Sequence, residues 1–220
     1  MEAQVLVMAT AVIGTGNIGS TVIRDLAAGG EDLVIASSSL DHARAFARSL
    51  PVKVNVATSE DAIKQADTVV LAVWMAQARN LIEANRESLA GKTVVDPTNN
   101  IGIDDNGGFV DLNPEGLSAG QQIAAMLPEG SHYVKAFGSL SAQSLESNGG
   151  PDGDAVALYY ATDDDQAASV AERLIGLAGF TPVKAGGTAD TGRIESFGDL
   201  HQSGGLNGAT LSADEARARI

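Results

Sequence analysis

The chain has 220 residues, of which 44% are hydrophobic and only 4% aromatic, so small aliphatic side chains must build its core. Its formal net charge of −14 argues against nucleic acid or an anionic membrane as a partner, because both require a basic surface. The absence of cysteine excludes disulfides, iron–sulfur clusters and thiolate zinc sites.

The first apolar run, 5–13, resembles the middle of a signal peptide in composition only. Glu2 precedes it instead of Lys or Arg, and it leads into glycines where a cleavage site would stand. About nine residues are also too few for a membrane span, which needs about 20. The sequence therefore predicts an unexported, cytoplasmic protein without a membrane segment.

Short runs of Val, Ile, Leu and Ala alternate with amphipathic helical patterns through most of the chain. Strands are predicted at Thr10–Ile13, Leu33–Ala36, Val52–Val56, Thr68–Val73, Thr93–Val95, Tyr133–Phe137, Ala155–Ala161 and Thr181–Lys184. Ser118 and Gln121 form a capping-box pattern, and Thr162 is expected to cap the helix that follows it. This alternation predicts an α/β fold: a Rossmann, doubly wound, mostly parallel sheet with a small C-terminal α/β extension.

Two glycine-rich loops, "GIDDNGGF" at 102–109 and "SNGGPDGD" at 147–154, interrupt the second half. We expect the second loop to separate a dinucleotide-binding Rossmann domain, 1–146, from a smaller portion, 154–220, that completes the sheet. Turn formation explains the Asp-Asp-Asn run of the first loop better than cation binding does. Asp163–Asp165 likewise marks the start of a helix, and no metal site is predicted.

The sequence "GTGNIG" at 14–19 has the spacing G-x-G-x-x-G between a predicted strand and a predicted helix. In such a turn Gly14 permits the tight bend, Gly16 leaves room for a pyrophosphate, and Gly19 lets the helix approach the strand. The alternative is a chance glycine turn in a chain with 25 glycines. The context favours dinucleotide binding, and the contacting residues would be Gly14, Thr15, Gly16, Asn17, Ile18 and Gly19.

The strand at 33–36 ends without the carboxylate that holds the ribose of NAD. Ser37, Ser38 and Ser39 stand there instead, followed by His42 and two arginines, Arg44 and Arg48. Hydroxyl donors and nearby cations suit the 2′-phosphate of NADP. Alternatively Ser39 only caps the next helix and both arginines face solvent; Asp41 and the negative net charge are the counter-arguments.

Six stretches together carry a resemblance to a known family. They are "IGTGNIGS" (13–20), "VIASSS" (34–39), "VVDPTNN" (94–100), "VKAFGSL" (134–140), "YYATDDDQAASVAERLIGLAGFTPVKAG" (159–186) and "GRIESFGDLHQSGGLNG" (192–208). In this order they resemble the NADP-dependent oxidoreductases related to the reductases of the 8-hydroxy-5-deazaflavin coenzyme. The resemblance covers nearly the whole chain.

The resemblance implies roles for individual positions. Thr15, Ser37 and Ser38 would contact the 2′-phosphate and adenosine end, with serine at position 38 where arginine is usual and His42 where lysine is common. Val73-Trp74-Met75 occupies the place of a Val-Pro-aromatic run. Pro97 and Thr98 would lie beside the nicotinamide ribose, and Gly138 stands where relatives often carry His or Asn.

Direct hydride transfer between two rings requires stacking and exclusion of water rather than a side-chain acid or base. We expect the pocket walls to be Trp74, Met75, Pro97, Gly138 and Ser139, with no catalytic side chain and a deazaflavin or flavin-type ring as second substrate. Each residue has a plainer interpretation: Trp74 at the rim or in a homodimer contact, Met75 in the core, Gly138 in a turn, His201 away from the site. The rival function is an NADP(H)-binding redox sensor without turnover.

Overall fold

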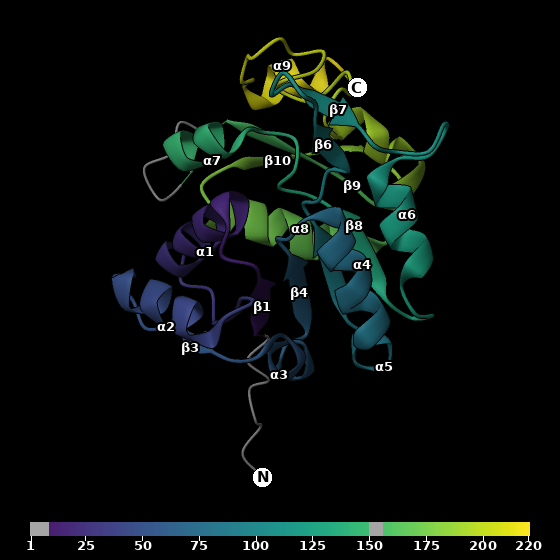
Figure 1. Ribbon diagram of the computed structural model, residues 1–220. Coiled ribbons are helices and arrows are strands. Elements are labelled where there is room, and N and C mark those ends of the chain that lie inside the picture. Colours follow the sequence, from purple (N-terminus) through teal and green to yellow (C-terminus); the bar gives the residue numbers. More distant parts are fainter. Residues whose placement is uncertain (1–8, 150–155) are drawn as a thin grey trace.

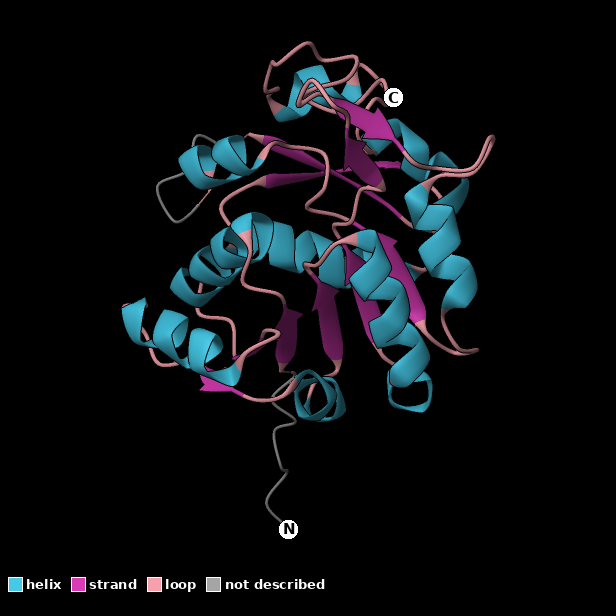
Figure 2. Cartoon of the chain, viewed as in Figure 1, coloured by secondary structure: helices cyan, strands magenta, loops and turns pink. Residues whose placement is uncertain are grey.

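The computed structural model describes residues 9–149 and 156–220, and an eight-stranded sheet with helices on both faces dominates it (Figures 1 and 2). The strands are β1 (Thr10–Ile13), β2 (Leu33–Ala36), β3 (Asn55–Val56), β4 (Thr68–Leu71), β5 (Thr93–Asp96), β6 (Ile101–Ile103), β7 (Phe109–Asp111), β8 (His132–Lys135), β9 (Ala157–Ala161) and β10 (Thr181–Gly186). The helices are α1 (Asn17–Ala28), α2 (Leu40–Ser49), α3 (Ser59–Gln65), α4 (Met75–Ala84), α5 (Arg86–Leu89), α6 (Ala119–Met126), α7 (Ala142–Asn148), α8 (Asp165–Leu177), the 3-10 helix η1 (Thr188–Ile194) and α9 (Ala213–Arg217).

The strand order of the large sheet is β10-β9-β8-β5-β4-β1-β2-β3. From β3 to β8 all neighbours run parallel, whereas β9 is antiparallel to β8 and parallel to β10. The predicted mostly parallel Rossmann sheet is therefore confirmed. The order reverses between β1 and β4, which is the switch point where this architecture binds ligands at the carboxyl ends of the strands.

The junction between β8 and β9 is a single residue pair, Lys135 with Ala161. Because both residues end their strands and the strands are antiparallel, β9 extends past the carboxyl end of β8. Figure 1 shows β9 and β10 above the parallel strands accordingly. The C-terminal portion thus lies over the edge of the sheet that carries the switch point.

Alternate residues of the strands pack against two separate helical layers. Val12 and Ile35 face the layer that includes α1 and α8, whereas Ile13 and Val34 face the layer that includes α3, α4 and α6. All four side chains are at most 4% exposed, as expected for strands covered on both faces. A third apolar cluster joins β9 and β10 to η1 and α9.

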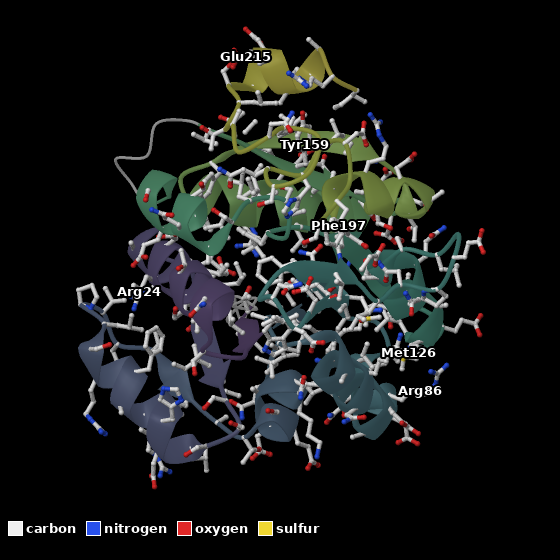
Figure 3. The ribbon with its side chains drawn as sticks, turned by 45° about the horizontal axis from the view of Figure 1, so that its top comes forward. Arg24, Arg86, Met126, Tyr159, Phe197 and Glu215 are labelled. Carbon is white, nitrogen blue, oxygen red and sulfur yellow. The ribbon has the colours of Figure 1, made fainter. Side chains whose placement is uncertain are left out.

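The last helix is fastened to this third cluster by a buried tyrosine. The hydroxyl of Tyr159 in β9 donates to the carbonyl of Ala216 in α9 at 2.9 Å. In Figure 3 Tyr159 lies below the helix that carries Glu215, and Phe197 lies nearer the middle of the molecule. Among the helices that the structure describes, none has the length and apolar character required to cross a bilayer.

Several strands differ in extent from the prediction. Of Val52–Val56 only Asn55–Val56 pairs in the sheet, and Val52 is 41% exposed. The strand predicted to end at Phe137 ends at Lys135, because Phe137 has φ +62°, a left-handed conformation that no strand accommodates. β4 stops at Leu71 and β10 continues to Gly186.

The glycine-rich loop at 102–109 is a β-hairpin rather than an unstructured loop, with β6 and β7 paired antiparallel. Oδ1 of Asp104 accepts the backbone N–H groups of Asn106 and Gly108 at 2.9 and 2.7 Å, and Gly107 has φ +82°. The interpretation of this acidic run as turn chemistry is consistent with these contacts. The other loop, 147–154, falls mostly on residues 150–155, outside the described residues, and so does the start of the strand predicted at Ala155.

The helix caps were predicted with mixed success. Ser118 and Gln121 form the expected capping box at α6. The prediction that Thr162 caps α8 is wrong: Asp164 is the cap and accepts the N–H of Ala167 at 2.8 Å. The Thr162 hydroxyl accepts the N–H of Asp164 instead, because a carboxylate next to the helix end interacts more favourably with its dipole.

Candidate dinucleotide site

The glycine turn lies at the switch point and leaves no room for side chains at two of its three glycines. Gly14 has φ +110°, and a Cβ there would lie 2.1 Å from the carbonyl oxygen of Ala72, the residue directly after β4. A Cβ on Gly19 would lie 2.2 Å from the carbonyl oxygen of Gly14. Both distances are far below van der Waals contact, so the turn and the start of α1 are pressed against the sheet.

Gly16 is the opposite case. No heavy atom lies within 4 Å of a Cβ built on it, and its φ of −74° is open to any residue. It is the N-cap of α1, yet no side chain caps this helix, and no acidic residue stands in its described first turn. The uncapped N–H groups and the positive end of the helix dipole face this open space. An open space at an uncapped helix start is the environment that an anionic group requires.

A cavity of about 260 Å³ continues from the turn between the ends of β1, β2 and β4. It brings together four of the predicted residues: Gly14, Ser37, Ser38 and Val73. The other lining residues are Ile13, Ser59, Gln77, Asn80 and Leu81, of which the sequence analysis selected none. Gln77 and Asn80 are polar residues three positions apart in α4, and only the structure shows that this helix borders the cavity.

The remaining residues of the predicted 2′-phosphate group have other contacts. Ser39 is the N-cap of α2 and accepts the N–H of His42 at 3.4 Å, so the capping interpretation holds for Ser39. Ser37 donates to the carbonyl of Ser39 at 2.7 Å. His42 is exposed, and the guanidinium of Arg44 lies 3.3 Å from Asp41. Hence only Ser37 and Ser38 of this group line the cavity.

Trp74 and Met75 follow β4 and point to different environments. Trp74 is the N-cap residue of α4 and is 61% exposed, next to the cavity-lining Val73. Met75 is 5% exposed and belongs to the core, with its sulfur 4.0 Å from the hydroxyl oxygen of Thr98. Trp74 is therefore exposed next to a residue that lines the cavity, whereas Met75 lies in the core in contact with Thr98.

The other predicted wall lies where β5 and β8 end, and all of it is buried. A Cβ on Gly138 would lie 2.8 Å from the carbonyl oxygen of Pro97, so this position accepts no larger residue without movement. The amide of Asn99 donates to the carbonyl of Gly138 at 3.0 Å. Ser139 is 1% exposed, and its hydroxyl has no hydrogen-bond partner among the described residues.

His201 lies beside this wall but is not poised to transfer protons. It is 5% exposed, and burial lowers its pKa to about 4, although a hydrogen bond with the Gly138 backbone opposes that shift. Its Nδ1 accepts the N–H of Ser203 at 3.0 Å. The imidazole is therefore neutral at pH 7 and holds no proton that it could donate as an acid.

A buried ionic cluster below the wall was not predicted from the sequence. Nζ of Lys135 lies 3.2 Å from Oδ2 of Asp96 and 3.2 Å from Oε1 of Glu195, and all three side chains are at most 3% exposed. The hydroxyl of Tyr133 donates to Asp96 at 2.8 Å. Burial raises the pKa of this hydroxyl, and the negative charge of Asp96 raises it further. The available signal was a lysine inside the apolar strand "YVKAF", since a buried ammonium requires an anionic partner.

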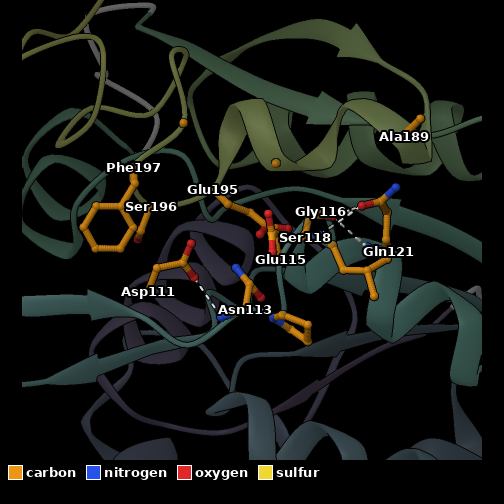
Figure 4. A pocket seen from close by; sticks show the side chains of 14 residues that line it. Asp111, Asn113, Glu115, Gly116, Ser118, Gln121, Ala189, Glu195, Ser196 and Phe197 are labelled. Atoms are coloured by element: carbon orange, nitrogen blue, oxygen red, sulfur yellow. Dashed lines mark hydrogen bonds between the residues drawn. The ribbon is translucent and has the colours of Figure 1, made fainter.

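A second cavity, of about 410 Å³, lies between the segment after β7 and the end of η1 (Figure 4). Its lining includes the carboxylates of Asp111, Glu115 and Glu195 and the half-exposed ring of Phe197. Glu195 belongs both to this cavity and to the ionic cluster. This acidic cavity is therefore adjacent to the wall formed by Pro97 and Gly138.

The sheet order and the glycine turn at the switch point define a Rossmann-fold protein. Residues 9–100 match the model of the family described as "NADP oxidoreductase coenzyme F420-dependent". This part of the chain is thus similar to the NADP oxidoreductases that depend on coenzyme F420, a deazaflavin. The resemblance stated from the sequence is confirmed, and so is the enzyme class, an NADP-dependent oxidoreductase.

Three similar proteins cover most of the chain. An F420-dependent NADP reductase from Methanothermobacter thermautotrophicus is 29% identical over 212 residues, 90% of this chain and 89% of the relative. A solved structure of a putative F420-dependent NADP reductase from Arthrobacter sp. FB24 is 27% identical with a TM-score of 0.69, covering 82% and 86% of the two chains. A hypothetical protein from Sinorhizobium meliloti is 25% identical with a TM-score of 0.78, covering 93% and 95%.

Proposed function

We propose that this protein transfers hydride directly between NADP(H) and a deazaflavin or flavin-type ring, without a side-chain acid or base. The observation that carries the proposal is the contrast within the glycine turn. Gly14 and Gly19 are closed to any side chain, whereas Gly16 is open at the uncapped start of α1. That combination is what a diphosphate needs: a rigid bend, free N–H groups and space.

Each part of the site then has a task. The α1 N-terminus holds the phosphates. Ser38 offers its hydroxyl to the 2′-phosphate in the cavity, and Ser37 does so once its hydroxyl turns away from the Ser39 carbonyl. Pro97 and Gly138 close the buried wall, which excludes water. NADPH, when bound, supplies the hydride. The side chains contribute positioning, and neutral His201 delivers no proton at pH 7.

The portion 154–220, which the sequence predicts to complete the second-substrate pocket, supports this assignment through the position of its described residues, 156–220. β9 and β10 lie over the carboxyl edge of the sheet, and Ser196 donates its N–H to Asn99 at 2.7 Å beside the wall. The predicted homodimer and cytoplasmic location belong to the proposal as well. Sedimentation velocity measures the first directly.

The test is oxidation of NADPH with a deazaflavin, then with flavins, using NADH as the control cofactor. We expect turnover with at least one acceptor and a lower dissociation constant for NADPH than for NADH. Ser37→Asp places a carboxylate at the end of β2 and should reverse that preference. Equal dissociation constants for both cofactors would contradict the NADP assignment, and tight binding without turnover would instead indicate a redox sensor.

A further inference from the structure

Lys135 is a fully buried ammonium that the proposed chemistry does not use. It projects from β8, is 0% exposed, and contacts three acceptors: Asp96, Glu195 and the carbonyl of Thr98. These acceptors come from two distant parts of the chain. A cation in such a place is costly unless its partners are fixed, so the geometry of all three is coupled through it.

The first partner is the turn that carries the predicted nicotinamide wall. The N–H of Thr98 donates to Oδ1 of Asp96 at 2.8 Å, while its carbonyl accepts from Lys135. Both backbone polar groups of Thr98, its N–H and its carbonyl, are therefore fixed by hydrogen bonds. Pro97, directly before it, presents the carbonyl that lies against Gly138. The ammonium therefore sets the position of the wall without touching it.

The second partner is the C-terminal segment. Glu195 accepts the N–H groups of Ala119 and Gly120 at the start of α6 at 2.8 and 2.7 Å, in addition to Lys135. The next residue, Ser196, donates to the side chain of Asn99. The N–H of Gln202 donates to the carbonyl of Ser139 at 2.9 Å. The segment 195–202 is consequently tied to both halves of the same wall.

We propose that Lys135 is a positioning residue: its ammonium fixes the Pro97–Asn99 turn relative to the segment 195–202, so that one cation sets the geometry in which hydride transfer occurs. This inference rests on the proposed function. Two carboxylates share the single ammonium, and the N–H groups of Thr98, Ala119 and Gly120 and the Tyr133 hydroxyl supply the remaining hydrogen bonds. Removing the cation leaves the two buried carboxylates without their shared counter-charge, so that they must separate or take up a proton, and either change alters the contacts that hold the turn and the segment.

Two variants test the proposal. Lys135→Met keeps the aliphatic part and removes the charge. Glu195→Gln keeps the Lys135 contacts to Asp96 and Thr98 and weakens the contacts of residue 195 with Lys135 and with the N–H groups of Ala119 and Gly120. The matched control is Arg173→Met, which removes an ion pair with the 6%-exposed Glu31 side chain at the amino end of the sheet. The full-length protein is used throughout.

For Lys135→Met we expect kcat with the best acceptor to fall at least about tenfold, since small displacements of reacting groups cost rate steeply. The dissociation constant for NADPH should change less than about threefold, because the diphosphate turn is untouched. Glu195→Gln should accelerate amide exchange at Ala119, Gly120 and Ser196 at least about tenfold, leave exchange at Thr98 unchanged, and lower kcat. Arg173→Met should leave kcat and these amides unchanged.

An unchanged kcat in both variants would overturn the proposal, and so would a fall in kcat matched by Arg173→Met at equal loss of stability. If Lys135→Met does not fold, Glu195→Gln alone decides, through exchange and kcat together. If the unmodified protein neither binds nor oxidises NADPH, the proposed function fails by itself. Exchange of the Ser196 amide in Glu195→Gln then still shows whether the segment is tied to the wall, and unchanged exchange at Ser196 would overturn the coupling.

Discussion

Gly16→Ala tests the site most directly, because the structure predicts that it separates binding from stability. The added methyl group meets no heavy atom within 4 Å and requires no change of φ. The loss of chain entropy in the unfolded state favours alanine by about 0.4–1 kcal/mol, whereas alanine is the poorer N-cap by about 1 kcal/mol. The free energy of unfolding should therefore change by less than about 1 kcal/mol.

Binding of NADPH should respond very differently. The methyl group fills the space where phosphate oxygens approach the backbone, and displacing two charge-assisted hydrogen bonds costs about 3 kcal/mol or more. At about 1.4 kcal/mol per factor of ten, the dissociation constant should rise on the order of 100-fold.

Titration calorimetry measures this constant, and the fluorescence of Trp74 gives a second signal, since it is the only tryptophan and neighbours the cavity-lining Val73. The matched control is Gly176→Ala in α8, another glycine with no heavy atom within 4 Å of an added Cβ. It should stabilise its helix by about 1 kcal/mol and leave binding unchanged. Equal affinity of Gly16→Ala and the unmodified protein would refute the diphosphate assignment of the turn.

Three further predictions concern stability. Gly19→Ala should lower the free energy of unfolding by about 2 kcal/mol in urea denaturation, because its Cβ would lie 2.2 Å from the Gly14 carbonyl oxygen; a loss below about 0.5 kcal/mol would contradict this close packing. The pKa of His201 is lowered from 6.5 to about 4, so its contribution to stability should be complete above pH 6.5 and lost as the pH falls toward 4. The loss should reach up to about 3 kcal/mol. His201→Gln should abolish this pH dependence in urea midpoints measured across that range. Burial raises the pKa of Asp25 to about 7, with the Arg24 charge opposing and the Glu146 charge assisting this shift. The contribution of Asp25 to stability should therefore fall as the pH rises from 3.8 toward 7. Asp25→Asn should raise the urea midpoint at pH 8 relative to the unmodified protein, and an unchanged midpoint would argue against the shift.

The parallel part of the fold could be predicted because its signals are local. Val12 and its neighbours form a continuous apolar run, and the spacing of Gly14, Gly16 and Gly19 is contained in six residues. Local patterns of this kind specify a strand, a turn and a helix start without long-range information. The alternation of such units then determines the sheet.

The features that were missed depend on distant contacts. Lys135 contacts Asp96 and Glu195, residues far away in the sequence, and only the folded sheet brings them together. The antiparallel direction of β9 is likewise invisible in its composition, since it reads like the other buried strands. Phe137 at φ +62° ends β8 although phenylalanine favours strands, because tertiary packing overrides its propensity.

The acidic cavity described beside the wall has a kinetic consequence. Asp111, Glu115 and Glu195 line it, on a chain whose formal net charge is −14, so we expect the protein to repel the phosphate groups of an approaching cofactor. Dissolved salt shortens the range of this repulsion from about 30 Å at 0.01 M to about 8 Å at 0.15 M. The association rate constant of the cofactor should therefore rise as salt is added, whereas it falls with salt for partners of opposite charge. In dilute buffer this protein would consequently bind its cofactor more slowly than at physiological ionic strength.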